Sequence, residues 1–335
     1  MKKILYYVSE HGLGHLTRSV ALIRELQNDT KVMIRNSNES FLKKSLPSIP
    51  VFSGQTDQGP IISDNSVSID WKRTHSSITD WYSNFSSNLE KELIFMKKSD
   101  PDLIISDISP IPLSAAKKLE IQSIALSNFT WLDIFSKLEN FNLNILKESY
   151  QNSSFCIQLP LSTSMDIFKQ KKQVGFVCKS LSEQKISVRK KLNIDESKFL
   201  IFVNLPKFYN VVLKNFENFQ VISTGAKTTS KNTMFIEPWI EGQNLINASD
   251  LVITKCGYGM ISECLTTGTP LKLIADDLHP EQSAMLKHLS NYGMMNRILD
   301  WKNGTLEVDF NDIQYFESYK NDNSNVKNIV QEFLK

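Results

Sequence analysis

The order of strands and helices in this chain predicts an α/β protein with two doubly wound domains that face each other across a cleft. Three observations support this fold class. The 335 residues suffice for two such cores, both halves alternate apolar strands with helices, and each half holds a strand, a glycine turn and a helix in succession. Because strands separated by helices are typical of parallel sheets covered on both faces, we expect ligands in the cleft, at the carboxyl ends of the strands.

The first glycine turn lies close to the start of the sequence. Residues 4–8 form an apolar run that predicts a strand, and Gly12 and Gly14 separate this run from a helix expected at 17–27. Glycine lets the backbone approach a ligand closely, and the unpaired N–H groups at a helix N-terminus favour an anion. The turn therefore predicts a site for a phosphate or carboxylate group.

Two ionisable side chains accompany this turn. Histidine as a residue type titrates near neutral pH and arginine carries a fixed positive charge, so His15 and Arg18 would let the turn combine anion binding with proton transfer. The alternatives are a histidine that only packs or caps the turn and an arginine that pairs with a nearby carboxylate. Asp107 ends another apolar strand, where a structural hydrogen bond is the alternative to a role in the site.

The rest of the first half continues the alternation. Apolar side chains recur at every fourth residue from Trp81 to Leu93 and predict one long helix, which Pro101 ends. The elements expected here are strands at 31–35, 103–106, 123–126 and 155–159 and helices at 40–45, 77–98, 112–119 and 131–150. We assign residues 1–165 to the first domain.

The alternation restarts in the second half. The expected elements are strands at 199–204, 220–223, 233–236, 251–254 and 271–275 and helices at 241–248, 259–266 and 281–291. We assign residues 166–312 to the second domain. The tail, 313–335, shows helical spacing near its end and is expected to pack back toward the first domain.

The second glycine turn joins a strand of the second half to a helix. Gly257 and Gly259 form it and predict another phosphate-sized pocket. Glu263 follows in the helix, where a carboxylate can accept two hydrogen bonds from a vicinal diol such as a ribose; a solvated helix position is the alternative. Glu281 and Gln282 follow the next strand and are suited to bind sugar hydroxyls.

The composition indicates which kinds of partner and which cellular compartment to expect. The net charge of +2 gives no argument for nucleic-acid binding, and we expect neither an export signal nor a membrane span. The four cysteines lack Cys-x-x-Cys spacing and are expected to be reduced thiols of a cytoplasmic protein. A basic stretch at 169–191 carries an excess of seven positive charges, and we interpret it as a solvated face, with contact to anionic lipid as the alternative.

The motifs, in their order and spacing, resemble glycosyltransferases of the GT-B fold over residues 4–299. Gly257-x-Gly259-x-x-x-Glu263, Gly268-x-Pro270 and Glu281-Gln282 are similar to the nucleotide-sugar signature of that group. The Gly-x-Gly-His turn resembles that of the lipid-linked N-acetylglucosaminyltransferase of wall synthesis and of diacylglycerol galactosyltransferases. A closer resemblance is to the glycosyltransferase-like N-terminal region of plant arabinokinases, through His11-Gly12-x-Gly14-His15-x-Thr17-Arg18, Ser106-Asp107-x-x-Pro110, Ser127-Asn128-Phe129-Thr130-Trp131 and Lys255-x-Gly257-Tyr258-Gly259.

The resemblance implies a role for each site residue. His15 would be the general base toward an acceptor hydroxyl, and Glu263 would hold the ribose of a nucleotide sugar, expected to be uridine-based. The second domain would bind the donor and the first the acceptor, with no metal or other cofactor. The implied donor-binding residues are Trp239, Gly257, Tyr258, Gly259, Glu263, Glu281 and Gln282, and the implied acceptor- or phosphate-binding residues are Gly12, Gly14, Arg18 and Asp107.

One segment departs from the pattern of these enzymes. Many relatives have a glycine-rich turn after the first strand of the second domain, whereas this chain has Leu205-Pro206-Lys207. Either Lys207 compensates with its charge or the donor site is impaired. The expected function is transfer of a sugar from a UDP-sugar to the hydroxyl of an unidentified glycan, lipid or small molecule. A UDP-sugar 2-epimerase-like enzyme and a non-catalytic nucleotide-sugar-binding protein are the alternatives.

Overall fold

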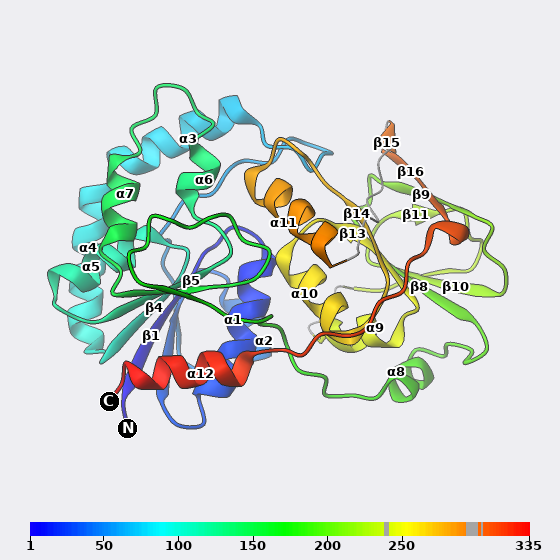
Figure 1. The fold of residues 1–335 in the computed structure, drawn as a ribbon, viewed down its shortest axis with the longest axis horizontal. Coiled ribbons are helices and arrows are strands. Elements are labelled where there is room, and N and C mark those ends of the chain that lie inside the picture. Colours follow the sequence, from blue (N-terminus) through cyan, green and yellow to red (C-terminus); the bar gives the residue numbers. More distant parts are fainter. Residues whose placement is uncertain (238–240, 293–300, 303) are drawn as a thin grey trace.

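The computed structural model of the chain contains two large parallel sheets with helices packed around them (Figure 1). The structure describes residues 1–237, 241–292, 301–302 and 304–335. The two sheets lie toward opposite ends of the molecule. Two helices of the second half, α10 (Tyr258–Thr267) and α11 (Pro280–Asn291), lie between them (Figure 1).

Seven parallel strands form the first sheet, in the spatial order β3-β2-β1-β4-β5-β6-β7. They are β1 (Lys3–Val8), β2 (Lys31–Arg35), β3 (Val51–Phe52), β4 (Leu103–Asp107), β5 (Ser123–Ser127), β6 (Phe155–Gln158) and β7 (Lys171–Gln173). Side chains of β1 alternate between two cores: Ile4, Tyr6 and Val8 face one, and Leu5 and Tyr7 face the other. The apolar runs of the central strands are thus explained by burial on both faces.

Seven helices belong to this sheet. They are α1 (Leu13–Leu26), α2 (Glu39–Ser45), α3 (Trp71–Ser83), α4 (Phe85–Ser99), α5 (Pro110–Lys118), α6 (Trp131–Phe135) and α7 (Asn144–Gln151). The long helix expected at 77–98 is wrong, because Asn84 ends α3 and its Nδ2 donates to the carbonyl of Asp80 at 2.9 Å. The single helix expected at 131–150 is also wrong, because Asn140 has a φ of 59°, which a right-handed helix cannot include.

Five parallel strands form the second sheet, in the order β12-β10-β8-β13-β14. They are β8 (Phe199–Asn204), β10 (Phe219–Ser223), β12 (Thr233–Phe235), β13 (Leu251–Lys255) and β14 (Leu271–Ile274). Besides α10 and α11, this half contains α8 (Lys185–Lys191), α9 (Gly242–Ala248), the short 3-10 helix η1 (Phe310–Asp312) and α12 (Asn323–Glu332). One core cluster includes β1 and α1 together with β8 and α10, so apolar packing is continuous between the two sheets.

A third, four-stranded sheet covers the second one where the sequence predicted no strands. Its strands are β11 (Lys227–Thr228), β9 (Asn210–Lys214), β16 (Thr305–Asp309) and β15 (Trp301–Lys302), in that order. The segment after β8 enters this sheet instead of forming a helix. Gly225 packs so tightly on the turn that a Cβ there would lie 2.8 Å from the carbonyl oxygen of Leu205. Lys207 is exposed in the same turn, and its compensating role stays a prediction.

Two segments connect the halves. The first sheet extends beyond residue 165, the expected end of the first domain, because β7 pairs in parallel with β6. After η1 the chain returns across the molecule, and α12 packs against α1 (Figure 1). On α12, Val326, Ile329 and Val330 are buried at helical spacing, which gives the tail its docking face.

Candidate functional site

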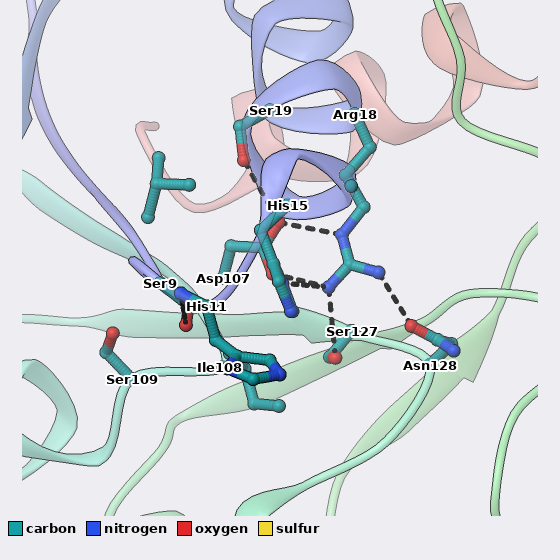
Figure 2. A network of polar contacts seen from close by, with 12 residues as sticks. Ser9, His11, His15, Arg18, Ser19, Asp107, Ile108, Ser109, Ser127 and Asn128 are labelled. Carbon is teal, nitrogen blue, oxygen red and sulfur yellow. Dashed lines mark hydrogen bonds and ion pairs between the residues drawn. The ribbon is translucent and has the colours of Figure 1, made fainter. Parts of the chain in front are cut away.

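The carboxyl ends of β1, β4 and β5 meet at one edge of the first sheet, where α1 begins. Gly12, the N-cap of α1, has a φ of 83°, which glycine adopts without the strain that other residues would suffer. His15 and Arg18 lie three residues apart on α1 and therefore share a face. Both reach Asp107, the last residue of β4 (Figure 2).

Asp107 is fully buried and holds both side chains. His15 Nδ1 lies 2.8 Å from Asp107 Oδ1, and Arg18 donates to both carboxylate oxygens, from Nε at 2.8 Å and from Nη2 at 2.5 Å. Ser19 Oγ donates to Oδ2 at 3.0 Å. A two-pronged guanidinium contact of this kind fixes geometry as well as charge. The structural hydrogen bond expected of Asp107 is thus present, and its role in the site stays a prediction.

These contacts determine where the proton of the imidazole lies. Burial raises the pKa of Asp107, but the guanidinium of Arg18 and the ring of His15 outweigh burial and lower it to about 2. Asp107 is therefore a carboxylate that only accepts hydrogen bonds, so His15 Nδ1 carries the proton that it donates. Arg18 Nη2 also lies 2.8 Å from His15 Nδ1, but it has two other acceptors for its two hydrogens, Asp107 Oδ1 at 2.5 Å and Ser127 Oγ at 3.3 Å. The free lone pair is then on His15 Nε2, as a general base requires.

Asn128, which was not among the predicted site residues, extends this network into the second half. It follows β5 and is fully buried, and its Oδ1 accepts a hydrogen bond from Arg18 Nη1 at 2.6 Å (Figure 2). Its Nδ2 donates to Oε1 of Glu281 on α11 at 3.1 Å. The motif at 127–131 was the only signal for Asn128, and it carried no information about these partners.

Aromatic rings and a second buried carboxyl group lie beside His15. The ring centroid of Trp131 is 5.4 Å from that of His11 and 6.4 Å from that of His15. Trp131 Nε1 donates to Oδ2 of Asp57 at 2.9 Å. Burial raises the pKa of Asp57, partly offset by hydrogen bonds from Ser9 and Trp131. No sequence signal pointed to Asp57, because it lies outside every strand and helix expected in the first half.

The second glycine turn packs against the first. Gly257 is the N-cap of α10. A Cβ on Gly259 would lie 2.8 Å from Thr17 Oγ1 and 3.6 Å from the Cα of Gly14, so only glycine permits this approach. The N-termini of α1 and α10 are thereby adjacent. Their unpaired N–H groups and positive dipole ends together favour a ligand with more than one negative charge.

Tyr258 connects this second turn to Arg18. The guanidinium carbon of Arg18 lies 5.3 Å from the ring centroid of Tyr258, within the range of a cation–π contact. The hydroxyl oxygen of Tyr258 accepts a hydrogen bond from the backbone N–H of Val177 at 3.2 Å, and burial raises the pKa of this hydroxyl. The Tyr258 side chain therefore holds the two halves together, and its place at the start of α10 leaves its backbone N–H for a ligand.

Glu263 is buried, which excludes the solvated helix position. It lies on α10 and is 5% exposed. Burial is the main reason that the pKa of its carboxyl is raised to about 7. The positive charge of Lys179 lowers this pKa, and the negative charge of Glu241 raises it further. Within the described residues, the Glu263 carboxylate accepts no hydrogen bond, so it has capacity for two hydroxyl donors.

The start of α11 supplies the other predicted donor contacts. Gln282 uses Oε1 to accept the backbone N–H of Asp276 at 2.9 Å, which fixes the loop between β14 and α11. Glu281 has one oxygen on Asn128, and the other accepts no hydrogen bond within the described part of the chain. His279, the N-cap, is 5% exposed; in the described structure its Nδ1 has no partner, and burial lowers its pKa.

The remaining predictions concern Trp239, the basic stretch, a metal ion and a membrane span. Trp239 lies outside the described residues. Lysines of the basic stretch at 169–191 pair with carboxylates: Lys171 with Asp166, Lys185 with Asp250, and Lys191 with Glu183. Asp166 and Asp250 lie outside the stretch and offset part of its excess charge. In the described ranges, no cluster of three or more His, Cys, Asp or Glu side chains is arranged for a metal ion. None of the described helices combines the length and apolarity needed to cross a bilayer.

Sequence comparison finds similarity along most of the chain. A family model described as Glycosyl transferase family 1 matches residues 2–307. The L-arabinokinase of Arabidopsis thaliana is 24% identical over 305 residues, which cover 86% of this chain and 29% of that protein. The chain thus spans less than a third of the length of this relative.

Solved structures show the same fold at low identity. Arabidopsis thaliana UGT89C1 complexed with UDP matches with a TM-score of 0.60 and 14% identity, over 100% of this chain and 91% of that one. A UDP-glucosyltransferase from Polygonum tinctorium matches with a TM-score of 0.60 and 11% identity, over 99% and 89%. These likenesses establish the GT-B fold. Because the family model covers nearly the whole chain, including both glycine turns, the chain belongs to glycosyl transferase family 1.

Proposed function

We propose that this chain transfers a sugar from a UDP-sugar to an acceptor hydroxyl, with His15 as the general base. The observation that carries the proposal is the pair of His15 and Asp107 beside the adjoining N-termini of α1 and α10. A uridine donor is supported by the fold neighbour UGT89C1, which was solved with UDP and with UDP-L-rhamnose. The same protein was solved with quercetin, but the acceptor of this chain is unidentified.

In the proposed reaction, Nε2 of His15 removes the proton of the acceptor hydroxyl as its oxygen attacks the anomeric carbon. The bond between that carbon and the β-phosphate oxygen breaks, and UDP leaves with the electron pair. Attack opposite the leaving group inverts the anomeric configuration. Asp107 stabilises the imidazolium that forms, and N–H groups at the start of α10 stabilise the charge on the diphosphate. Since helix termini supply this stabilisation, we propose that no metal or other cofactor takes part.

A panel of UDP- and GDP-sugars tests the proposal by saturable binding and by release of nucleoside diphosphate. Glu263→Ala should abolish donor binding, whereas His15→Ala should spare binding and lower turnover about 10²–10⁴-fold. His75→Ala is the matched control, because His75 lies on α3 and packs against Phe141. Binding of none of these nucleotide sugars, or loss of binding in His15→Ala with retention in Glu263→Ala, would contradict the assignment. Undiminished turnover after treatment with EDTA supports the absence of a metal.

A UDP-sugar 2-epimerase-like activity is the second candidate. It requires further acid–base groups near the sugar, and His11 and Asp57 lie next to His15. The two functions predict different products from UDP-N-acetylglucosamine without an acceptor: an epimerase yields an isomeric sugar, whereas a transferase yields only slow hydrolysis. A protein that binds nucleotide sugars without catalysis would show tight binding and neither product.

We also propose a reducing compartment, the cytoplasm, for this chain. All four cysteines are buried free thiols. Burial raises the pKa of the Cys178 thiol to about 12, so that thiol is not reactive at neutral pH. Denaturing the cells in the presence of a thiol-alkylating agent and counting the alkylated cysteines of the chain should find four reduced thiols.

A further inference from the structure

Asn128 lies between the two halves with both ends of its side-chain amide in use. Oδ1 accepts from Arg18 Nη1 at 2.6 Å, and Nδ2 donates to Glu281 Oε1 at 3.1 Å. Arg18 contacts Asp107, which in turn contacts His15. Hydrogen bonds therefore run without a gap from the carboxylate at the start of α11 to the base on α1.

The orientation of this amide follows from chemistry. A guanidinium only donates hydrogen bonds, so the side of Asn128 that faces Arg18 must be its oxygen. The NH₂ group must then face Glu281, where it meets a carboxylate that only accepts. Asn128 is fully buried, which keeps water from competing for either contact. An aspartate at this position would satisfy Arg18 but place a second carboxylate against Glu281.

We infer that Asn128 is a positioning residue that orients Glu281 for the donor sugar from the opposite domain. Oε1 of Glu281 is held by Asn128, and within the described residues Oε2 accepts no hydrogen bond. Oε2 is thereby presented to one hydroxyl of the donor sugar. This inference rests on the proposed function, because only a sugar-bearing nucleotide uses the contact. Recognition of the sugar then depends on the contact between Asn128 and Glu281, whereas recognition of UDP does not.

The central variant is Asn128→Asp, with UDP, UDP-glucose and UDP-N-acetylglucosamine as probes in calorimetric titrations. One of the two UDP-sugars should bind the unsubstituted chain more tightly than UDP does. In Asn128→Asp the affinity for that UDP-sugar should fall about ten- to a hundredfold, while the affinity for UDP should change less than about twofold. In Asn128→Asp/Glu281→Gln, a side-chain amide at position 281 donates to the carboxylate at position 128. This reversed pair should recover most of the affinity that Asn128→Asp loses.

Ser19→Ala is the matched control. Ser19 contacts the same network through Asp107 at 3.0 Å and has no contact with Glu281. The variant disturbs the catalytic pair, but the ratio of affinities for UDP and the nucleotide sugar should stay unchanged. An equal loss of affinity for both probes in Asn128→Asp would overturn the inference and leave the proposed function intact.

Melting temperatures without any nucleotide provide a readout that does not depend on the function. Asn128→Asp should lower the melting temperature, and Glu281→Gln should restore part of that loss in the double variant. Strictly additive changes would show that the two side chains do not interact, which overturns the inference. Coupled melting temperatures together with no binding of any nucleotide sugar to the unsubstituted chain would instead refute the proposed function, and the role in sugar recognition with it.

Discussion

Glu263→Gln should make the protein more stable at pH 8 while weakening nucleotide binding. Burial raises the pKa of Glu263 from 4.5 to about 7, so ionising this carboxyl is harder in the folded chain than in the unfolded one. At 1.36 kcal/mol for each pH unit, that difference corresponds to about 3 kcal/mol. The contribution of the Glu263 carboxyl to the free energy of unfolding is fully present below pH 4.5 and is lost as pH rises through about 7. Glutamine has the same shape as glutamate but does not ionise, so Glu263→Gln avoids this loss of stability.

Thermal unfolding at two pH values measures the effect. An unfolding entropy of about 2.1 cal/mol/K for each residue gives about 0.7 kcal/mol/K for a chain of 335 residues, so 3 kcal/mol raises the melting temperature by about 4 °C at pH 8. At pH 5 the gain should fall below about 1 kcal/mol. Glu90→Gln, an exposed position on α4, is the matched control and should change neither value.

Glu263→Gln should weaken ligand binding although it stabilises the fold. A carboxylate accepts two hydrogen bonds from a diol, whereas the glutamine oxygen is a single acceptor, so the affinity for UDP should fall at least about tenfold. A Glu263→Gln protein that is less stable at pH 8 than the unsubstituted chain would refute the reasoning. It would mean that attraction between Glu263 and Lys179 outweighs the cost of burying the charge.

Three other changes test the geometry of the site. Asp107→Asn removes the negative charge and one of the two acceptor oxygens that hold His15 and Arg18, so it should lower kcat about 10²–10⁴-fold with UDP affinity unchanged. A parallel loss of UDP affinity in titrations would contradict this role. Gly259→Ala places a Cβ 2.8 Å from Thr17 Oγ1 and should cost about 1–3 kcal/mol in urea unfolding, with part of the loss recovered in Gly259→Ala/Thr17→Ala. Tyr150→Phe removes the donor to the carbonyl of Ile108 at 2.8 Å and should cost about 1–3 kcal/mol by the same assay.

The glycine turns could be predicted from sequence because each is a local feature. Strand, turn and helix follow one another within about twenty residues, and the same short segment holds the side chains to which the proposal assigns a function. His15 and Arg18 are three positions apart on one helix, so their shared face follows from helical geometry alone. The parallel strands could be predicted equally well, since a strand buried on both faces has an uninterrupted apolar run in its sequence.

The partners of those side chains could not be predicted, because they come from distant segments. Asn128 and Arg18 are 110 positions apart, and Asn128 and Glu281 are 153 apart. Nothing in one sequence specifies such contacts until the strands are placed side by side. The third sheet was missed for the same reason, since β9 pairs with β16 from the far end of the chain. Single asparagines, Asn84 and Asn140, interrupt the helices expected at 77–98 and 131–150. The spacing of apolar side chains does not change at these residues, so it could not predict the breaks.

The features that oppose folding gather where the two halves meet. Among the described residues with positive φ, Ile108 is the only β-branched one; its φ is 71° and it directly follows Asp107. Glu263 is buried at the expense of its charge, and His279 has an Nδ1 without a partner in the described structure. A stable fold needs none of these three departures. Strain and unsatisfied groups persist where function requires them, so their place beside both glycine turns supports the proposal that this interface is the functional site.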